Sequence, residues 1–543
     1  MTPAVDGDTA DDALQTRARH SGRRLNLVFS DEFEESGRSF GAGDDRFIEA
    51  LEKPDYSNQA IQFYNASREY VTTKDGSLVL MTRAVKTTWE VGRNAMTGER
   101  VMETKNYTSG MIQTWNKFCY TGGVLEMAIE LPGSANSGGL WPAAWLMGNL
   151  ARATFDKTTI YKWPWSYDRC DGGVQDLETK QEINACSAAP GHGMHPHQGR
   201  GAPEIDIFEV MPGHNMPGHE GLVKAFMSSS LQVAPGIDST RNRPKNGEKL
   251  GPNTTWYSSL EYNPSVSALN DGFWGAMCGP VEDPTPRQEH KYQEDAISVN
   301  TDLNQTHFDS MHVYRLEWEP GSTEGGGYIE WYLDDDFIFG ISGDDLAATT
   351  GAMIPAEPMY LILNTAISHR WGMPEPCDIA HCPMCWRCYD CTNPDCQCTL
   401  PDGMKGCKNL PAEMRIDYIR LYQDADNQKH TVGCSPPGYP TSEYIAAHQE
   451  DYAPWRATPQ ALILSDADWN IVLGLLAASS LALLGCCVWL ILRVPAKKGA
   501  AAPTDRTRLI DPKGNSSGNS NRMRPIPTAH TSARDPVHQY QKL

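Results

Sequence analysis

Three acidic residues in the segment PEIDIFEV are the side chains of this chain best suited to do chemistry. Glu204 and Asp206 are two positions apart, so on a regular strand both point to the same face. Glu209 would point to the opposite face unless a β-bulge at Ile207 or Phe208 adds one residue and resets the alternation. With such a bulge, we expect all three carboxyl groups to share one face of a strand.

Three carboxyl groups on one face repel one another, which is costly for a purely structural strand. Two carboxyl groups about 5–5.5 Å apart are the arrangement that retaining glycoside hydrolysis uses. On that interpretation Glu204 is the nucleophile, Glu209 is the general acid/base with a raised pKa, and Asp206 positions the nucleophile. The alternative is an exposed strand whose acids face water. The apolar residues between the acids require a buried opposite face and weaken that alternative.

The elements that must position these acids are mainly β-strands. Short runs that alternate apolar and polar residues are separated by Gly, Pro and Asn, and no long amphipathic helix lies between them. Many strands over roughly 400 residues predict a large all-β sandwich or jelly roll. The clearest runs begin at Leu25, Ser77, Val124, His312, Tyr328, Met359 and Met414.

The longest apolar run, residues 471–492, predicts a transmembrane helix. Its 22 residues carry no charge, and a helix of that length is roughly 33 Å long, enough to cross a hydrocarbon core of about 30 Å. The alternative, a buried core helix, is normally shorter and keeps a polar stripe. The residues after the run have a net charge of +7, so the part before it carries −28. The positive-inside rule then predicts a single-pass membrane protein of the secretory pathway, with its large acidic part luminal or extracellular.

Other features bear on that topology. Residues 1–24 contain no apolar signal-peptide core, and their polar, Asp-rich composition predicts disorder. Four N-glycosylation sequons agree with a luminal location; they begin at Asn65, Asn106, Asn253 and Asn304.

Cysteines are concentrated in one segment. Of the 15 cysteines, 13 lie outside the apolar run, and eight of these fall between Cys377 and Cys407. Paired CxxC spacing can hold zinc in a reducing compartment. In an oxidising lumen it favours a small disulfide-stapled insertion, which we expect over residues 377–410. The odd total leaves at least one thiol free or intermolecular.

Composition limits the partners. The net charge of −21 makes nucleic acid a poor partner. The 15 Trp and 21 Tyr supply flat faces that suit neutral sugars or apolar partners. The segment HGMHPHQGR contains His192, His195 and His197, but we expect a solvated loop rather than a metal site, because no carboxylate stands at ligand spacing.

The segment EIDIFE resembles the active-site signature of glycoside hydrolase family 16 in its bulged form. Further segments are similar to the fungal β-glucan synthesis-associated branch of that family, and together they cover residues 25–423. They include LVFSDEF at 27–33, GLWPAAWLMGNL at 139–150 and MRIDYIRLYQ at 414–423. The resemblance implies a concanavalin-A-like jelly roll and a retaining mechanism, with Glu204 as nucleophile and Glu209 as acid/base.

Two features depart from that resemblance. The fungal members usually carry a membrane span before the catalytic domain, whereas here it follows. We recognise no counterpart of the cysteine-rich segment between Cys377 and Cys407 in the fungal proteins.

Tryptophans near the acids are the expected sugar contacts, because the C–H faces of glucose stack on aromatic rings. For any one of them the alternative is core packing. The first candidates are Trp141 and Trp145, followed by Trp115, Trp163 and Trp165, with Trp371 weaker.

The sequence therefore predicts a membrane-anchored retaining enzyme that modifies β-glucan, by transglycosylation or hydrolysis, in cell-wall or storage glucan biosynthesis and without a cofactor. The alternative is a glucan-binding or scaffolding protein with a vestigial site, against which the intact acidic triad argues. The expected parts are a disordered segment 1–24, a glycosidase/transglycosylase domain 25–424, a stalk 425–468, a transmembrane helix 469–493 and a disordered cytoplasmic tail 494–543.

Overall fold

The computed structural model describes most of the chain up to residue 455. The described residues are 4–136, 138–159, 162–165, 170, 181–189, 194–211, 225–234, 261–270, 295–322, 324–349, 351–368, 388–401, 403–455 and 462–463. They divide into two compact units: the first holds the described residues up to 89 and from 103 to 455, and the second holds 90–102 and 462–463.

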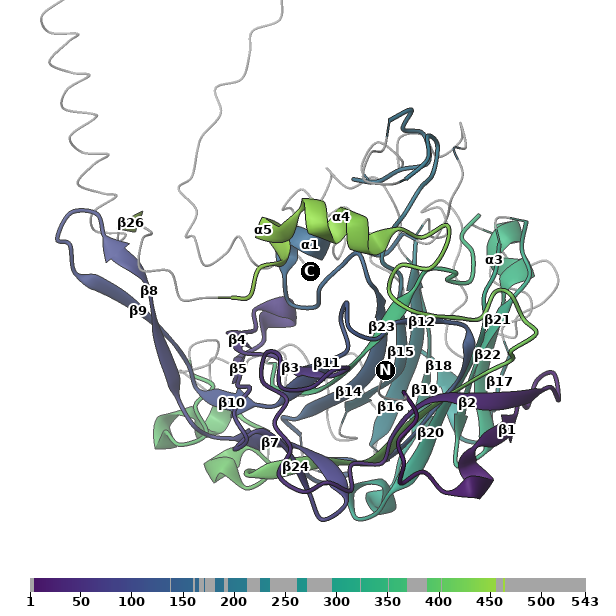
Figure 1. Ribbon diagram of the computed structural model, residues 1–543. Coiled ribbons are helices and arrows are strands. Elements are labelled where there is room, and N and C mark those ends of the chain that lie inside the picture. The colour runs from purple at the N-terminus through teal and green to yellow at the C-terminus, as the bar shows by residue number, and fades with distance from the viewer. Residues whose placement is uncertain are drawn as a thin grey trace, which may run out of the picture. The chain divides into compact units, whose positions relative to one another are not determined.

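Two large sheets dominate the described part of the first unit (Figure 1). The strands of sheet A, in spatial order, are β17 (Glu261–Tyr262), β22 (Asp336–Ser342), β21 (Tyr328–Leu333), β20 (His312–Glu319), β13 (Gly123–Glu130), β24 (Ala412–Gln423), β7 (Ser77–Arg83), β10 (Tyr107–Ser109), β5 (Gln62–Tyr64) and β4 (Lys53–Pro54). Three further strands pair outside this order: β2 (Arg24–Asp31) pairs with β24, β1 (Gln15–Arg17) pairs with β2, and β6 (Val71–Lys74) pairs with β7.

Sheet B carries the acidic segment near its middle. Its order is β18 (Ser267–Leu269), β19 (Asp295–Asp302), β16 (Phe226–Val233), β15 (Glu204–Met211), β14 (Trp141–Gly148), β23 (Met359–Ala366), β11 (Met111–Gln113) and β3 (Glu49–Ala50), with β12 (Tyr120–Thr121) and β25 (Thr431–Val432) alongside. A three-stranded sheet of β26 (Leu462–Ile463), β8 (Thr87–Asn94) and β9 (Arg100–Lys105) lies mostly in the second unit.

The helices among the described residues are short. They are α1 (Asp156–Thr159), α3 (Gly343–Thr349), α4 (Thr441–Ala447) and α5 (Gln449–Tyr452), with 3-10 turns at Asp11–Ala13, Ser57–Gln59, Gln305–Phe308, Pro394–Thr399 and Lys405–Cys407.

The core lies between the two sheets, because alternate residues of each strand face the other sheet. Leu125 of β13 and Leu316 of β20 come from sheet A, and Ile205 of β15 and Leu231 of β16 come from sheet B; all four are buried in one apolar cluster. The all-β sandwich expected from the sequence is thus confirmed.

The N-terminal segment corrects one expectation. Residues 1–24 were expected to be disordered, but from Ala4 onward they are ordered, and β1 pairs antiparallel with β2. The backbone N–H groups of Arg19 and His20 both donate to the buried carboxylate of Glu317, at 2.6 and 3.2 Å. Local composition predicts disorder here, but bonds to a strand about three hundred positions away supply the order.

The segment after β24 corrects another expectation. Residues 425–455, expected to form part of a stalk, fold against the sandwich, and a disulfide joins Cys434 to Cys119. Tyr444 and Ile445 of α4 and Tyr452 of α5 are buried in a cluster with Leu150. Figure 1 shows α4 and α5 close to α1. We refer to residues 425–455 as the C-terminal segment.

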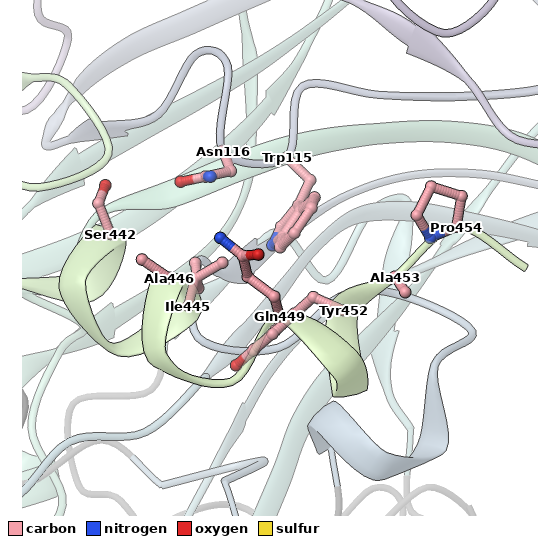
Figure 2. A pocket seen from close by; sticks show the side chains of 9 residues that line it. All are labelled: Trp115, Asn116, Ser442, Ile445, Ala446, Gln449, Tyr452, Ala453 and Pro454. Carbon is pink, nitrogen blue, oxygen red and sulfur yellow. The ribbon is translucent and has the colours of Figure 1, made fainter.

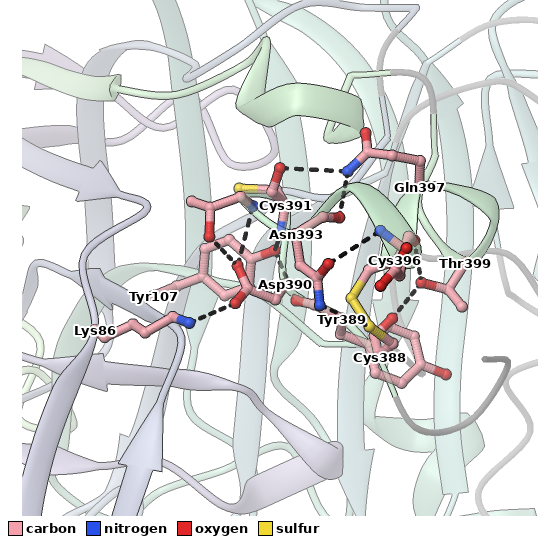
Figure 3. Close-up of a disulfide and its surroundings, with 12 residues drawn as sticks. Lys86, Tyr107, Cys388, Tyr389, Asp390, Cys391, Asn393, Cys396, Gln397 and Thr399 are labelled. Carbon is pink, nitrogen blue, oxygen red and sulfur yellow. Dashed lines mark hydrogen bonds and ion pairs between the residues drawn. A yellow bond between two sulfur atoms is a disulfide. The ribbon is translucent and has the colours of Figure 1, made fainter.

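The described part of the cysteine-rich insertion is held by disulfides, as expected. Cys388 pairs with Cys396 (Figure 3), and Cys391 pairs with Cys407. Asp390 of this insertion forms a 2.6 Å ion pair with Lys86. Cys377, Cys382 and Cys385 lie outside the described residues.

Within the residues that the structure describes, no helix is long and apolar enough to cross a membrane. The expected span at 471–492 and the tail after it lie outside those residues.

Candidate active site

A β-bulge in β15 sets the geometry of the acids. Asp206 lies opposite Trp145 of β14, and the next paired residue is Phe208, opposite Ala144. Ile207 is therefore the extra residue on the bulged strand, which is one of the two positions expected from the sequence. The pairing with β16 is interrupted over the same interval, between Asp206 and Glu209.

The bulge divides the residues of β15 between two faces. Ile205, Ile207, Phe208 and Val210 all belong to the core cluster. Glu204, Asp206 and Glu209 are therefore left on the opposite face of sheet B.

Two donors satisfy the backbone carbonyls at the bulge. The Trp331 indole N–H on β21 of sheet A donates to the carbonyl oxygen of Asp206 at 2.9 Å. The Ser229 hydroxyl on β16 donates to the carbonyl oxygen of Ile207, also at 2.9 Å. An unpaired buried carbonyl is destabilising, so these two bonds fix the bulge in position.

Glu204 accepts one hydrogen bond on each carboxylate oxygen. The Trp163 indole N–H donates to Oε2 at 2.8 Å, and the Gln232 amide on β16 donates to Oε1 at 2.9 Å. Burial raises the pKa of Glu204 well above its ordinary value, and the neighbouring charges of Asp206 and Glu209 add to the rise. The Trp163 bond opposes the rise, because it stabilises the charged form.

Asp206 lies between the two glutamates and is almost fully buried. Its Oδ2 accepts hydrogen bonds from the Ser230 hydroxyl and from the same Gln232 amide that contacts Glu204. Burial raises the pKa of Asp206, whereas hydrogen bonds from Ser230, Gln232 and Glu204 lower it. The Gln232 amide thus contacts both carboxyl groups and links the position of Asp206 to that of Glu204.

Glu209 is buried, with 7% of its surface exposed. Within the described residues its Oε2 has no hydrogen-bond partner. Burial raises the pKa of Glu209 well above its ordinary value, and the charge of Asp206 raises it further, while the Trp141 indole opposes the rise by hydrogen bonding. A raised pKa favours the protonated form of Glu209, which is the form that a general acid needs.

Three of the expected tryptophans lie beside the acids. Trp163 binds Glu204, and Trp141 is the residue that stabilises the charged form of Glu209. Trp145 lies opposite Asp206 on the same face and donates its indole N–H to Asn364 of β23 at 2.9 Å.

The other tryptophans have different surroundings. Trp165 is fully buried against Ala234 and Met353, so the expectation that it offers a face to a sugar is wrong. Trp115 stacks on Tyr452 and lines a cavity of about 430 Å³ together with residues of α4 and α5 (Figure 2). Trp371 lies outside the described residues.

Sequence reasoning missed the polar partners on β16. Ser230 and Gln232 pair with Asp206 and Glu204, respectively. The segment FMSSSLQV does alternate, because Ser228, Ser230 and Gln232 are separated by residues of the other face, and that pattern could have been recognised. Nothing in one sequence says which strand lies beside β15.

Of the described residues, no group of three or more His, Cys, Asp and Glu side chains is placed to hold a metal ion. His195 and His197 lie in a loop, and His192 falls outside the described part of the chain.

Sequence comparison shows which family the chain resembles. The model of the family "Beta-glucan synthesis-associated protein SKN1/KRE6/Sbg1" matches residues 1–270, 285–387 and 404–461. The beta-glucan synthesis-associated protein SKN1 of Candida albicans is 32% identical over 469 residues, which are 83% of this chain and 52% of that protein. KRE6 of the same organism is 31% identical over 468 residues, with 82% and 52% covered. The chain thus spans about half the length of these relatives.

Solved structures are more distantly similar. The endo-beta-1,3-glucanase from Pyrococcus furiosus is 18% identical with a TM-score of 0.39, covering 76% of this chain and 98% of that one. The laminarinase catalytic domain from Thermotoga maritima is 20% identical with a TM-score of 0.37, covering 74% and 99%.

Proposed function

This chain belongs to the SKN1/KRE6/Sbg1 family of beta-glucan synthesis-associated proteins, and on that basis we propose that it is a retaining enzyme that cleaves and re-forms the glucosidic bonds of β-glucan. The observation that carries the proposal is the bulged strand β15, on which Glu204, Asp206 and Glu209 share one face. A strand with no chemical task has no need of three carboxyl groups on one face, two of them buried.

In the first step, a carboxylate oxygen of Glu204 attacks the anomeric carbon of the donor glucan. The bond from that carbon to the glycosidic oxygen breaks, its electron pair stays on the oxygen, and this oxygen takes the proton of Glu209. The products are a glycosyl ester on Glu204 and a shortened glucan. The Trp163 and Gln232 hydrogen bonds to Glu204 favour the ionised nucleophile that this step needs.

In the second step, the Glu209 carboxylate removes a proton from an acceptor hydroxyl, whose oxygen attacks the same anomeric carbon. The ester bond breaks and its electron pair returns to Glu204, so the configuration is retained overall. A sugar hydroxyl as acceptor gives transglycosylation, and water gives hydrolysis. We favour transglycosylation, because the relatives are associated with glucan synthesis.

Asp206 acts through Glu204 in this scheme. Because the Gln232 amide donates to both Asp206 and Glu204, Asp206 helps to fix the orientation of the nucleophile. Trp141 and Trp145 are the aromatic side chains proposed to contact the sugar rings.

We place the protein in the secretory pathway, anchored by residues 471–492 with its β-sandwich on the luminal or extracellular side. Disulfides such as Cys119–Cys434 and Cys391–Cys407 support that location, because they persist in oxidising compartments. The partners are then β-glucan and, through the apolar run, the lipid bilayer.

The test is incubation of the full-length protein with β-1,3- and β-1,6-linked gluco-oligosaccharides, with Glu204→Gln as the matched inactive control. Products longer than the substrate support transglycosylation, and shorter products alone support hydrolysis. Binding without any change in chain length would overturn the proposal in favour of a glucan-binding protein with a vestigial site.

A further inference from the structure

A chain of polar contacts runs from the C-terminal segment toward the acids. Tyr444 of α4 donates its hydroxyl hydrogen to Oε1 of Glu182 at 2.7 Å. The other carboxylate oxygen of Glu182 forms an ion pair with Nζ of Lys162. This ammonium group also lies 5.3 Å from the centre of the Tyr444 ring. Only 2% of the Lys162 side chain is exposed, whereas 39% of the Glu182 side chain is, so water reaches the ion pair from the Glu182 side alone.

Lys162 belongs to the described segment 162–165, which also carries Trp163. The backbone of this segment is fixed to residues that flank two strands of sheet B. Ala202, just before β15, donates to the carbonyl of Lys162, and Ala234, just after β16, donates to the carbonyl of Pro164, each at 2.9 Å. The side chain of Lys162 fixes the same segment to α4 through Glu182. The next residue, Trp163, reaches Glu204.

Close packing leaves this segment little room to move. Gly201 lies against Trp165, and a Cβ atom on Gly201 would stand 2.2 Å from the Trp165 carbonyl oxygen. A displacement of Lys162 is therefore passed along the segment to Trp163 rather than absorbed locally.

The charge of Lys162 indicates that this residue does more than fill space in the core. Burying an ammonium group costs several kcal/mol before its partners compensate, and an apolar side chain of similar size often stabilises such a site as well. A buried lysine is useful where its directional contacts hold the neighbouring backbone in one position. Lys162 precedes Trp163, whose indole N–H must stay within hydrogen-bond distance of Glu204, at 2.8 Å.

We propose that Tyr444, Glu182 and Lys162 are positioning residues, through which the C-terminal segment holds Trp163 against the carboxylate of Glu204. The effect of these positioning residues on catalysis rests on the proposed function, in which Glu204 is the nucleophile. The C-terminal segment is then part of the working enzyme rather than a passive connection.

The groups around Glu204 determine whether its pKa rises or falls when the Trp163 hydrogen bond is weakened. The titratable groups facing it are Asp206 and Glu209 on its own strand and Tyr360 on β23. The residues paired with it on β14 and β16, Met147 and Gln232, are neutral. Loosening the Trp163 bond removes a donor that stabilises the carboxylate, so the pKa of Glu204 rises and activity is lost at a higher pH on the acid side.

The test compares Tyr444→Phe and Lys162→Met with Tyr452→Phe in the full-length protein. Tyr444→Phe keeps the ring and removes only the hydroxyl that binds Glu182. Tyr452→Phe is the matched control, because its hydroxyl donates to the carbonyl of Leu150 in the same cluster and does not contact Lys162. Two quantities are measured against pH: kcat/KM on a gluco-oligosaccharide, and the indole N–H resonance of Trp163, assigned by its absence in Trp163→Phe.

We expect Tyr444→Phe to shift the acid limb of kcat/KM and the midpoint of the indole titration upward in pH together, and to lower kcat/KM by about tenfold, since a misplacement of about 1 Å can cost up to a hundredfold. Lys162→Met should do the same if it folds, and Tyr452→Phe should leave both midpoints unchanged. Unchanged midpoints in Tyr444→Phe, or equal shifts in Tyr452→Phe, would overturn the positioning role. If the wild type has no turnover but its indole titration still shifts in Tyr444→Phe, the proposed function fails and the contact chain stands.

Discussion

Glu204 and Glu209 lie on one strand, but different groups stabilise their charged forms. Two neutral donors, Trp163 and Gln232, hold the carboxylate of Glu204. Glu209 has the Trp141 indole as its stabilising neighbour and keeps one oxygen without a partner among the described residues. Burial raises the pKa of both groups, but among the described residues Glu204 has two donors where Glu209 has one. Hydrogen bonding therefore favours ionisation of Glu204, as a nucleophile requires, over ionisation of Glu209, the proposed general acid.

The buried Glu209 predicts an effect on stability that depends on pH. Its pKa is raised in the folded state, so its contribution to stability is present at low pH and is lost as the pH rises through the folded pKa. Above that pH the wild type loses about 1.4 kcal/mol for each unit by which the pKa is raised. Glu209→Gln should therefore melt at a higher temperature than the wild type at pH 8, and the difference should shrink at pH 4.

Thermal melts at the two pH values check this, with the exposed Glu324→Gln as control. The control should not change the melting temperature at either pH. A Glu209→Gln protein that is less stable than the wild type at pH 8 would contradict the assignment of a raised pKa.

Much of the site at the residue scale could be predicted from the sequence. The spacing of Glu204, Asp206 and Glu209, with apolar residues between them, is enough to require a bulge if all three are to share a face. The role of Gln232 as a hydrogen-bond donor to the acids could not be predicted, because neither segment alone indicates which distant strand it pairs with. The burial of Trp165 could not be seen for the same reason, since its neighbours Ala234 and Met353 are far along the chain.

At the scale of elements, the bulge depends on a strand of the other sheet. Trp331 on β21 donates to the carbonyl of Asp206 across the core. Trp318 on β20 makes a comparable bond, donating to the carbonyl of Pro355 at 2.7 Å, and both indoles are almost fully buried. The two residues differ mainly in whether their acceptor lies beside the acids.

We predict that Trp331→Phe and Trp318→Phe each lower the free energy of unfolding, by about 1–3 kcal/mol, because each leaves a buried carbonyl without its donor. Only Trp331→Phe should also lower kcat, because only that carbonyl belongs to the bulge that orients the acids. Chemical denaturation and rates on a gluco-oligosaccharide measure the two effects. Equal losses of activity in both variants would mean that the bulge does not depend on Trp331.

The elements that sequence reasoning missed are ordered by distant partners. Strands such as β13 and β20 could be predicted from the sequence, because the alternation of apolar and polar residues is a local pattern. The order of residues 4–24 comes from Glu317, and α4 and α5 follow a disulfide whose cysteines are 315 positions apart. Composition describes only local preference, so it indicated disorder and a stalk in these places.

At the scale of the whole molecule, the proposed luminal orientation can be read from glycosylation. Asn304 is exposed, and its sequon residue Thr306 is exposed as well. In the sequon of Asn106 the hydroxyl of Thr108 is buried, with 1% exposure, and donates to the carbonyl of Val85 at 2.9 Å. Asn253 lies outside the described residues.

We therefore expect a glycan on Asn304 and none on Asn106. After expression in a eukaryotic secretory host, Asn304→Gln should migrate faster on electrophoresis than the wild type by the mass of one glycan. Treatment of the wild type with a glycosidase should give the same increase in mobility. The matched variant Asn106→Gln should migrate like the wild type. If the protein carries no glycan at all, the luminal orientation is wrong; the β-sandwich and its acids do not depend on that result.

The most direct test of the central claim, that Glu204 is the nucleophile of a retaining glucan-modifying enzyme, is to trap the intermediate. An activated 2-deoxy-2-fluoro-glucosyl donor slows both steps, so the glycosyl-enzyme accumulates, and peptide mass spectrometry then identifies the modified residue. We predict one added sugar on the peptide that contains Glu204, no label in Glu204→Gln, and a label that persists in Glu209→Gln, since an activated leaving group needs little protonation. A label on Glu209, or turnover of glucan by a protein in which no residue of β15 is ever labelled, would contradict the account.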